Sequence, residues 1–332
     1  MNSNKHPQTT DRVETSPPDV DEILLTAADE APPDDVLVLT AADEVTDDAS
    51  PVARSLGPRR IRLPVLLFVA TCLSTLLAGS EFRMEGWAIE FDLMSGLAYS
   101  AALMTILVCH EAGHYLQARR YGVYASLPYF LPMPFSPFGT FGAVIGMDTR
   151  VRHRKALFDI GVTGPLAGLV PTLVCCVIGL RLSTVAATVA PNEPVLGTSF
   201  LFSTLAGWLV GPESGALIKL HPLAFAGWVG LLITALNLLP IGQLDGGHIL
   251  YGLLGSRARF VAAAILIAAI WVTIRLWLFW WWLMLFLLIL MGPGHPPTSN
   301  DREPVGWIRV ILGLLALALV PLAFTPQPIL LF

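Results

Sequence analysis

The chain has 332 residues, of which 54% are apolar and 14% are charged, and its mean hydropathy is +0.65. Average soluble domains contain about 25% charged residues, so this composition excludes an ordinary soluble globular protein and indicates a membrane protein. The formal net charge of −5 excludes the basic character that is typical of nucleic-acid-binding proteins.

Residues 1–53 form an acidic segment. Residues 1–50 hold 13 of the 25 Asp and Glu residues, and the sequence Leu-Thr-Ala-Ala-Asp-Glu occurs at 25–30 and again at 39–44. Such a segment buries too little apolar surface to offset its conformational entropy, so we expect a disordered tail. The repeats have two alternative interpretations. They belong to an arm that docks on a partner or regulates the protein, or they are part of a solvated tail without a specific role.

Residues 54–325 are the expected membrane domain, and residues 326–332 are a short C-terminal tail. About 20 apolar residues cross a bilayer as a helix. The apolar block Phe260–Met291 would measure about 48 Å as one helix, which is too long for one span. The alternative is a helical hairpin that turns near Arg275. The sequence therefore predicts an all-α protein with six or seven transmembrane helices. The candidate spans are Leu63–Gly79, Gly96–Ala118, Ala156–Leu180, Pro222–Leu239, Phe260–Met291 and Val305–Ala323.

Basic residues alternate with these spans. Lys and Arg residues cluster before the first span, after the second, before the third and after the fourth, whereas the opposite loops hold only Arg83, Arg181 and Lys219. Because Lys and Arg are enriched in cytoplasmic loops, this pattern predicts a multi-pass protein with a cytoplasmic N-terminus. The polar residues 110–114 and 245 then lie towards the cytoplasmic side, at similar depth.

The second expected span contains His110-Glu111-Ala112-Gly113-His114, an HExxH motif. On a helix, residues i and i+4 share a face, so His110 and His114 can offer two imidazoles to one Zn²⁺. Glu111 in this motif acts as the general base on a metal-coordinated water. Ionisable residues inside a span are costly and mark functional sites, which favours a metal centre over a polar helix interface.

A catalytic zinc takes three protein ligands, and the segment 237–248 is the expected source of the third. Asp245 is the only acidic residue between Glu213 and Asp301. Pro240 and the glycines after Asp245 are expected to break the helix, and broken backbone inside a membrane is tolerated only where it is buried or lines a wet cavity. A carboxylate at such a break can reach the metal.

Two more polar side chains of this segment have alternative roles. His248 is either a rival ligand or, the favoured interpretation, a hydrogen-bonding partner beside the site. Asn237 lies two helical turns before Asp245. It either donates to the carbonyl or oxyanion of a substrate or joins two helices by a hydrogen bond.

The combination of HEAGH with NLLPIGQLDGGH resembles the site-2 protease family of intramembrane zinc metalloproteases, over roughly residues 60–325. The resemblance implies one Zn²⁺ per chain, held by His110, His114 and Asp245, with Glu111 as the catalytic acid and base. It also implies hydrolysis of peptide bonds within or near transmembrane segments of membrane-anchored proteins. Gly164–Gly168 in the third span resembles the family's small-residue segment, which lets helices approach closely.

The segment 127–147 is apolar but rich in Pro and Gly, so it is not a helix. It is expected to form an irregular strand or a re-entrant β-hairpin, and it resembles the Gly-x-Phe-Gly loop of the chloroplast and cyanobacterial-like branch of the family. Gly139, Phe141 and Gly142 are the candidates for pairing with an unwound substrate strand. The alternative is a lid over the metal without a substrate role.

The loop 183–220 has about 38 residues, too few for the PDZ domain that many bacterial relatives carry for substrate selection, and its segment 200–210 is a candidate interfacial helix. The expected partners are a single-span membrane protein as substrate and the lipid bilayer. The resemblance suggests cleavage of a membrane-tethered regulator or clearance of signal peptides. The rival functions are a membrane zinc transporter and a catalytically silent protein that binds or retains membrane clients.

Overall fold

A computed structural model describes residues 58–80, 82–85, 88–147, 151, 153–186, 195–211, 217–301 and 303–330, all within the unit Val52–Phe332. The expected disordered tail, residues 1–53, lies outside the described residues. The helices are α2 (Pro58–Gly79), α3 (Leu93–Arg120), α4 (Arg154–Leu182), α5 (Phe200–Leu209), α6 (Pro222–Asn237), α7 (Asp245–Leu254), α8 (Ala258–Arg275), α9 (Trp282–Met291) and α10 (Trp307–Ala323).

Short antiparallel strand pairs join the ends of these helices. They are β1 (Phe82–Glu85) with β2 (Ala88–Phe91), β3 (Tyr129–Met133) with β4 (Gly139–Val144), β5 (Thr184–Ala186) with β7 (Leu217–Lys219), and β6 (Val195–Leu196) with β8 (Ile329–Leu330). The segment 326–332, expected as a tail, thus contributes a strand that pairs with the loop after α4.

Four segments of the described chain are long and apolar enough to cross a membrane: Ile61–Gly79, Leu93–Arg120, Arg154–Leu182 and Asp245–Arg275. By length and composition these indicate an integral membrane protein. The last segment is not one straight helix, because Gly255, with a φ of +58°, separates α7 from α8. The remaining apolar helices have 10–17 residues, so the prediction of six or seven spans stays a prediction.

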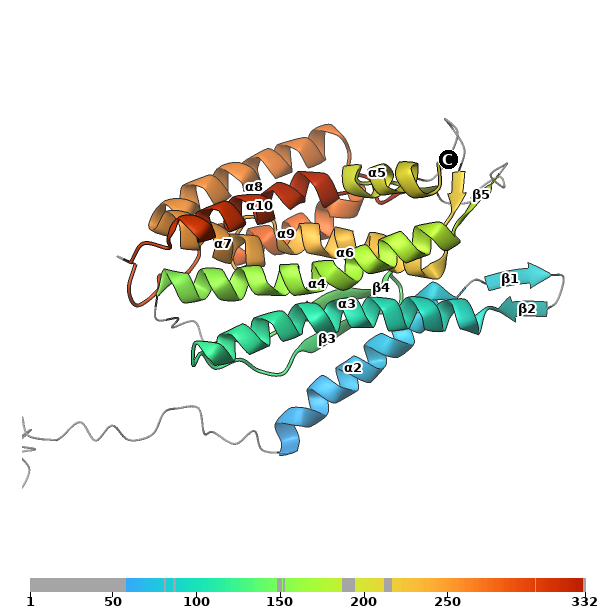
Figure 1. Ribbon diagram of the computed structural model, residues 1–332, viewed down its shortest axis with the longest axis horizontal. Coiled ribbons are helices and arrows are strands. Elements are labelled where there is room, and N and C mark those ends of the chain that lie inside the picture. The colour runs from blue at the N-terminus through green and yellow to red at the C-terminus, as the bar shows by residue number, and fades with distance from the viewer. Residues whose placement is uncertain are drawn as a thin grey trace, which may run out of the picture. The chain divides into compact units, whose positions relative to one another are not determined.

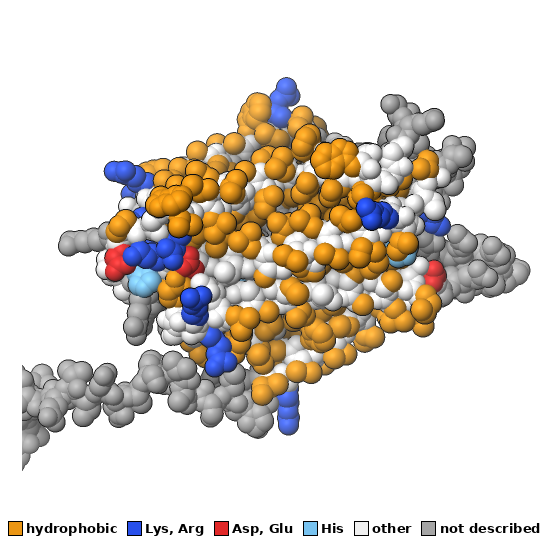
Figure 2. Space-filling view, viewed as in Figure 1, with side chains coloured by type: hydrophobic (Ala, Val, Ile, Leu, Met, Phe, Trp, Pro, Cys, Tyr) orange, Lys and Arg blue, Asp and Glu red, His pale blue; other side chains and the backbone are white. Residues whose placement is uncertain are grey.

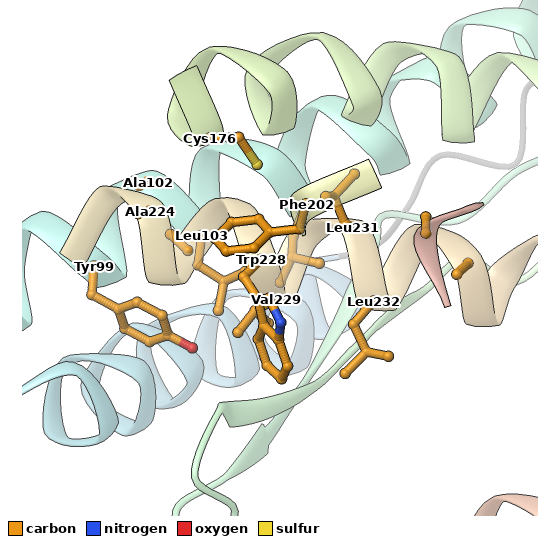
Figure 3. Close-up of a cluster of buried hydrophobic side chains, with 14 of the residues drawn as sticks. Tyr99, Ala102, Leu103, Cys176, Phe202, Ala224, Trp228, Val229, Leu231 and Leu232 are labelled. Carbon is orange, nitrogen blue, oxygen red and sulfur yellow. The ribbon is translucent and has the colours of Figure 1, made fainter. Parts of the chain in front are cut away.

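The long helices α3 and α4 lie side by side (Figure 1), and α6 packs against both of them. The backbones of α4 and α6 approach closely at Gly227, where a Cβ would lie 2.7 Å from the backbone nitrogen of Cys176. Trp228 on α6 is 1% exposed and Tyr99 on α3 is fully buried, and both point into the cluster of apolar side chains between these helices (Figure 3). Hydrophobic side chains cover much of the face of the molecule that Figure 2 shows, as expected for helices that face lipid.

The segment 127–147 forms the β3–β4 hairpin, with a register irregularity between Phe130 and Pro132. Hydrogen bonds attach the turn end of the hairpin to two helices. The Ser74 hydroxyl of α2 donates to the carbonyl oxygen of Gly139 (2.6 Å), and the Tyr99 hydroxyl of α3 donates to that of Phe138 (2.8 Å). The hairpin is therefore fixed beside α2 and α3, and its re-entrant position stays a prediction.

Candidate metal centre

Helix α3 places His110 and His114 on one face, one turn apart. The helix begins after Asp92, whose carboxylate accepts hydrogen bonds from the backbone N–H groups of Met94 and Ser95. The two Nε2 atoms of the histidines are 3.1 Å apart, and both side chains are buried. The spacing of the motif on a 28-residue helix is sufficient to produce this pair.

Asp245 reaches the histidines because the chain breaks between α6 and α7. Helix α6 ends at Asn237, the chain turns through Pro240 and Gly242 (φ +58°), and α7 begins at Asp245. A Cβ on Gly246 would overlap the carbonyl oxygen of Leu238, so only glycine allows this tight return. Oδ2 of Asp245 then lies 3.1 Å from Nε2 of His110, and Oδ1 lies 3.2 Å from Nε2 of His114.

The three side chains fit a tetrahedral cation. One ligand atom from each of His110, His114 and Asp245 lies within 4.8 Å of the others. Nδ1–H of His114 donates to the carbonyl oxygen of Ile160 (2.8 Å), so Nε2 of the neutral ring carries a lone pair that faces the other two groups. Ligand atoms around zinc at bonds of about 2.0 Å are about 3.3 Å apart, close to the separations found here. Lone pairs that face one another at this distance repel unless a cation or a proton lies between them.

Glu111 lies beside this group but outside it. Its side chain is 4% exposed and lines the same cavity of about 200 Å³ as the three candidate ligands. A buried carboxylate next to a metal centre can accept a proton from water and return it to another atom, which is the role expected from the motif.

Two glycines of helix α4 face the histidines of the site. A Cβ on Gly164 would overlap the imidazole ring of His114, and a Cβ on Gly168 would lie 3.0 Å from Cβ of His110. The carbonyl oxygen that orients His114 belongs to Ile160 on the same helix. The small residues of the segment 164–168 therefore give the histidine rings room, besides allowing α3 and α4 to approach.

Asn237 and His248 both line the cavity. Nδ2 of Asn237 lies 3.3 Å from Nε2 of His110. His248 is outside the group of three candidate ligands, and its Nδ1 lies 2.7 Å from Nε2 of His295. Sequence reasoning missed His295, which follows an apolar helix in a Pro- and Gly-rich segment and belongs to no motif.

The predicted hairpin residues lie beside the cavity rather than in its wall. Gly139 (φ +75°) packs on α2, where a Cβ would lie 2.6 Å from Cα of Thr75. Gly142 (φ +95°) has open space around it, and Phe141 is 45% exposed. The cavity wall is formed by the residues that follow them, Ala143 to Ile145 and Met147.

Comparison with known proteins points to one family. Residues 98–280 match peptidase family M50. The chain is 35% identical over 244 residues to the probable zinc metalloprotease EGY1, chloroplastic, of Arabidopsis thaliana (71% of this chain, 43% of the relative). It is 30% identical over 284 residues to the probable zinc metalloprotease EGY2, chloroplastic, of Oryza sativa subsp. japonica (78% and 50%). The chain spans half or less of the length of these relatives, and no solved structure matches it.

Proposed function

Because the chain belongs to peptidase family M50, we propose that it is an intramembrane zinc metalloprotease, which hydrolyses peptide bonds within or near the membrane-spanning segments of membrane-anchored proteins. The observation that carries the proposal is the buried group of His110, His114 and Asp245, with Glu111 in the same cavity and all four residues on segments long enough to cross a membrane. The similarity to proteins named zinc metalloproteases supports zinc as the metal.

Nε2 of His110, Nε2 of His114 and the carboxylate of Asp245 would hold one Zn²⁺ per chain. When bound there, zinc supplies a coordinated water of lowered pKa and polarises the substrate carbonyl. Glu111 takes a proton from the water whose oxygen attacks the peptide carbonyl carbon, and it passes that proton to the departing amine nitrogen. The C–N bond breaks, and the products are a carboxylate and an amine.

We propose that Asn237 stabilises the negative charge that develops on the carbonyl oxygen, and its position in the cavity lining next to His110 supports this role. We expect Asn237→Ala to lower the cleavage rate by about 10²-fold while the zinc content stays at one ion per chain. Single-turnover cleavage and metal analysis of the same preparation measure both quantities. Unchanged cleavage would leave Asn237 with only the role of joining α3 and α6.

The substrate segment must unwind, because a helical peptide bond is shielded by its own hydrogen bonds. Strand β4 leads directly into the cavity wall at Ala143 and Val144. A substrate strand that pairs beside Gly139, Phe141 and Gly142 would therefore be led towards Glu111.

Gly142 tests this role of the hairpin better than Gly139, which packs against α2. We expect Gly142→Ala to lower cleavage about tenfold with zinc retained, because a φ of +95° is strained for an L residue and the added strain is of order 1–3 kcal/mol. Gly122→Ala is the matched control, since Gly122 (φ +65°) also has open space and lies away from the cavity. Equal losses of cleavage in both variants would contradict a specific role.

We propose that the chain crosses the membrane six or seven times, with its N-terminus and the metal centre towards the cytoplasm. Arg119 lies in the last turn of α3, and Arg154 and Lys155 begin α4. Lys and Arg side chains gather at this end of the two helices (Figure 2). The helices α6, α9 and α10 are the additional candidate spans. The proposed partner is a single-span substrate in the bilayer.

The test of the proposed function is cleavage of a labelled single-span protein by the purified chain in proteoliposomes. We expect cleavage that a zinc chelator stops and added zinc restores, with one zinc ion per chain. Cleavage that persists after complete removal of zinc would overturn the proposal. One zinc ion per chain without cleavage of any single-span substrate would instead support the catalytically silent alternative.

A further inference from the structure

His248 and His295 form a hydrogen-bonded pair in the cavity wall, and the pair has a defined direction. Nδ1 of His295 lies 2.6 Å from the carbonyl oxygen of Pro296, which can only accept, so this Nδ1 carries the proton. Burial lowers the pKa of His295, against smaller opposing effects of the Pro296 carbonyl and Asp301, which favours a neutral ring. Its Nε2 is then an acceptor, and Nδ1–H of His248 donates to it (2.7 Å).

This direction leaves Nε2 of His248 without a proton. Among the described residues, none donates a hydrogen bond to that nitrogen, although His248 lines the cavity. The other side-chain acceptors of the cavity wall have roles of their own or are exposed: Asp245 contacts the histidines, Glu111 is the proposed proton carrier, Asn237 contacts His110, and Gln243 is exposed. Nε2 of His248 is therefore a hydrogen-bond acceptor that is available to an N–H donor in the cavity.

The segment that carries His295 is held firmly. This segment, residues 292–301, is named the strap. The Tyr251 hydroxyl of α7 donates to Oδ2 of Asp301 (2.7 Å), and the backbone N–H of Ser299 donates to the carbonyl oxygen of Val151 (3.1 Å). The His295 ring lies 4.8 Å, centroid to centroid, from the rings of both His248 and Tyr251. These contacts fix His295, which in turn fixes the tautomer of His248.

An unwound peptide needs such an acceptor. Each peptide unit that leaves a helix exposes one N–H and one C=O, and burying either without a partner is costly. Asn237 in the cavity offers a donor for the C=O, and Nε2 of His248 offers an acceptor for the N–H. The cavity is thus complementary to both polar groups of an extended backbone.

We propose that Nε2 of His248 accepts a hydrogen bond from a backbone N–H of the unwound substrate, and that His295 is the positioning residue that keeps this nitrogen unprotonated. The inference rests on the proposed function, because it takes an unwound peptide as the ligand of the cavity. It makes His248 a substrate-binding residue rather than a metal ligand.

The test is a backbone ester scan measured by binding. Synthetic single-span peptides of about 30 residues each carry one ester in place of one amide, which removes a single N–H. Their dissociation constants are measured with the zinc-loaded Glu111→Gln variant, because this variant is expected to bind the peptide without cleaving it. The measurement is repeated with the double variant Glu111→Gln, His248→Leu. We expect one ester position to weaken binding about tenfold when His248 is present and less than twofold in His248→Leu.

Variants at His295 separate positioning from simple packing. His295→Gln keeps an acceptor for Nδ1–H of His248 and should retain the ester penalty, whereas His295→Leu should lose it. In ¹⁵N spectra, His248 should be protonated at Nδ1 in His295→Gln and mixed in His295→Leu. Glu303→Gln is the matched control beside the strap, because it removes only the exposed ion pair with Lys155 (3.0 Å) and should retain the penalty.

The outcomes distinguish this inference from the proposed function. If one ester position weakens binding only when His248 is present, but the unchanged chain cleaves no substrate, the inference is supported and the proposed protease function is overturned. If the chain cleaves its substrate but no ester position has an effect on binding that depends on His248, the protease function is supported and the inference about His248 is overturned. Loss of zinc from His248→Leu would also overturn the inference, because it would place His248 in the metal site.

Discussion

Replacing Glu111 by glutamine is expected to lower the rate of peptide hydrolysis by about 10³-fold and to leave the zinc content at one ion per chain. Glu111 lines the cavity beside the candidate ligands but is not one of them. Glutamine has nearly the same shape and cannot take a proton from water, so binding survives and proton transfer fails. Single-turnover cleavage of a labelled single-span protein, with metal analysis of the same sample, measures both effects.

The control for this prediction is Glu303→Gln, which removes an exposed carboxylate that does not line the cavity. Its cleavage rate should equal that of the unchanged chain. If Glu111→Gln cleaved within about tenfold of the unchanged chain, another group would have to carry the proton. If Glu111→Gln lost its zinc, Glu111 would belong to the ligands and the assignment of roles would have to be reversed.

The geometry of the metal centre follows from local rules in the sequence. The four-residue spacing of His110 and His114 places both rings on one face of any helix. The expected helix break at Gly246 is wrong, because Gly246 and Gly247 lie in the first turn of α7. Pro240 predicts a break before Asp245, and the structure has α6 ending at Asn237 and α7 beginning at Asp245. Both inferences depend on neighbours within a few residues, which is the range over which sequence patterns are informative.

Features that depend on distant segments were not predictable in the same way. Strands β6 and β8 have two residues each and pair across more than 130 positions, so neither carries a local signal. His295 matters only because the strap returns to α7. The hairpin was predicted from its Pro and Gly residues, yet its packing on α2 decides that Ala143 and Val144, rather than Gly139 and Gly142, line the cavity.

The number of spans is a similar case. A hydrophobic segment near 20 residues identifies a span by itself, but α6 has 16 residues and α9 has 10. Helices of this length cross a bilayer only with help from neighbouring chain or from local thinning of the membrane. The turn after α8 is at Arg275, where the sequence predicts it, because a basic residue interrupts an otherwise continuous apolar block.

Gly164→Ala is expected to weaken zinc binding and cleavage together, because it adds one methyl group beside a ligand. The new Cβ would overlap Nε2, Cδ2 and Cε1 of His114. The ring cannot swing away without losing the hydrogen bond from Nδ1–H to Ile160, which lies one turn earlier on α4. We expect zinc affinity to fall by more than about tenfold, because groups that orient ligands typically affect affinity by 10- to 100-fold and here the ligand itself is displaced. Competition with a fluorescent chelator measures the affinity.

Two other glycines make this prediction specific to the ring of His114. Gly207→Ala in α5 has no atom within 4 Å of the new Cβ, and alanine favours a helix over glycine by about 1 kcal/mol, so zinc binding should be unchanged. Gly168→Ala places its Cβ 3.0 Å from that of His110, which needs only a small shift of α3, so an intermediate loss is expected. Equal zinc affinity in all three variants would mean that α3 and α4 separate freely. If zinc affinity is lowest in Gly164→Ala, intermediate in Gly168→Ala and unchanged in Gly207→Ala, then α4 controls the metal affinity through Gly164. At that position the His114 ring occupies the space that a side chain would need.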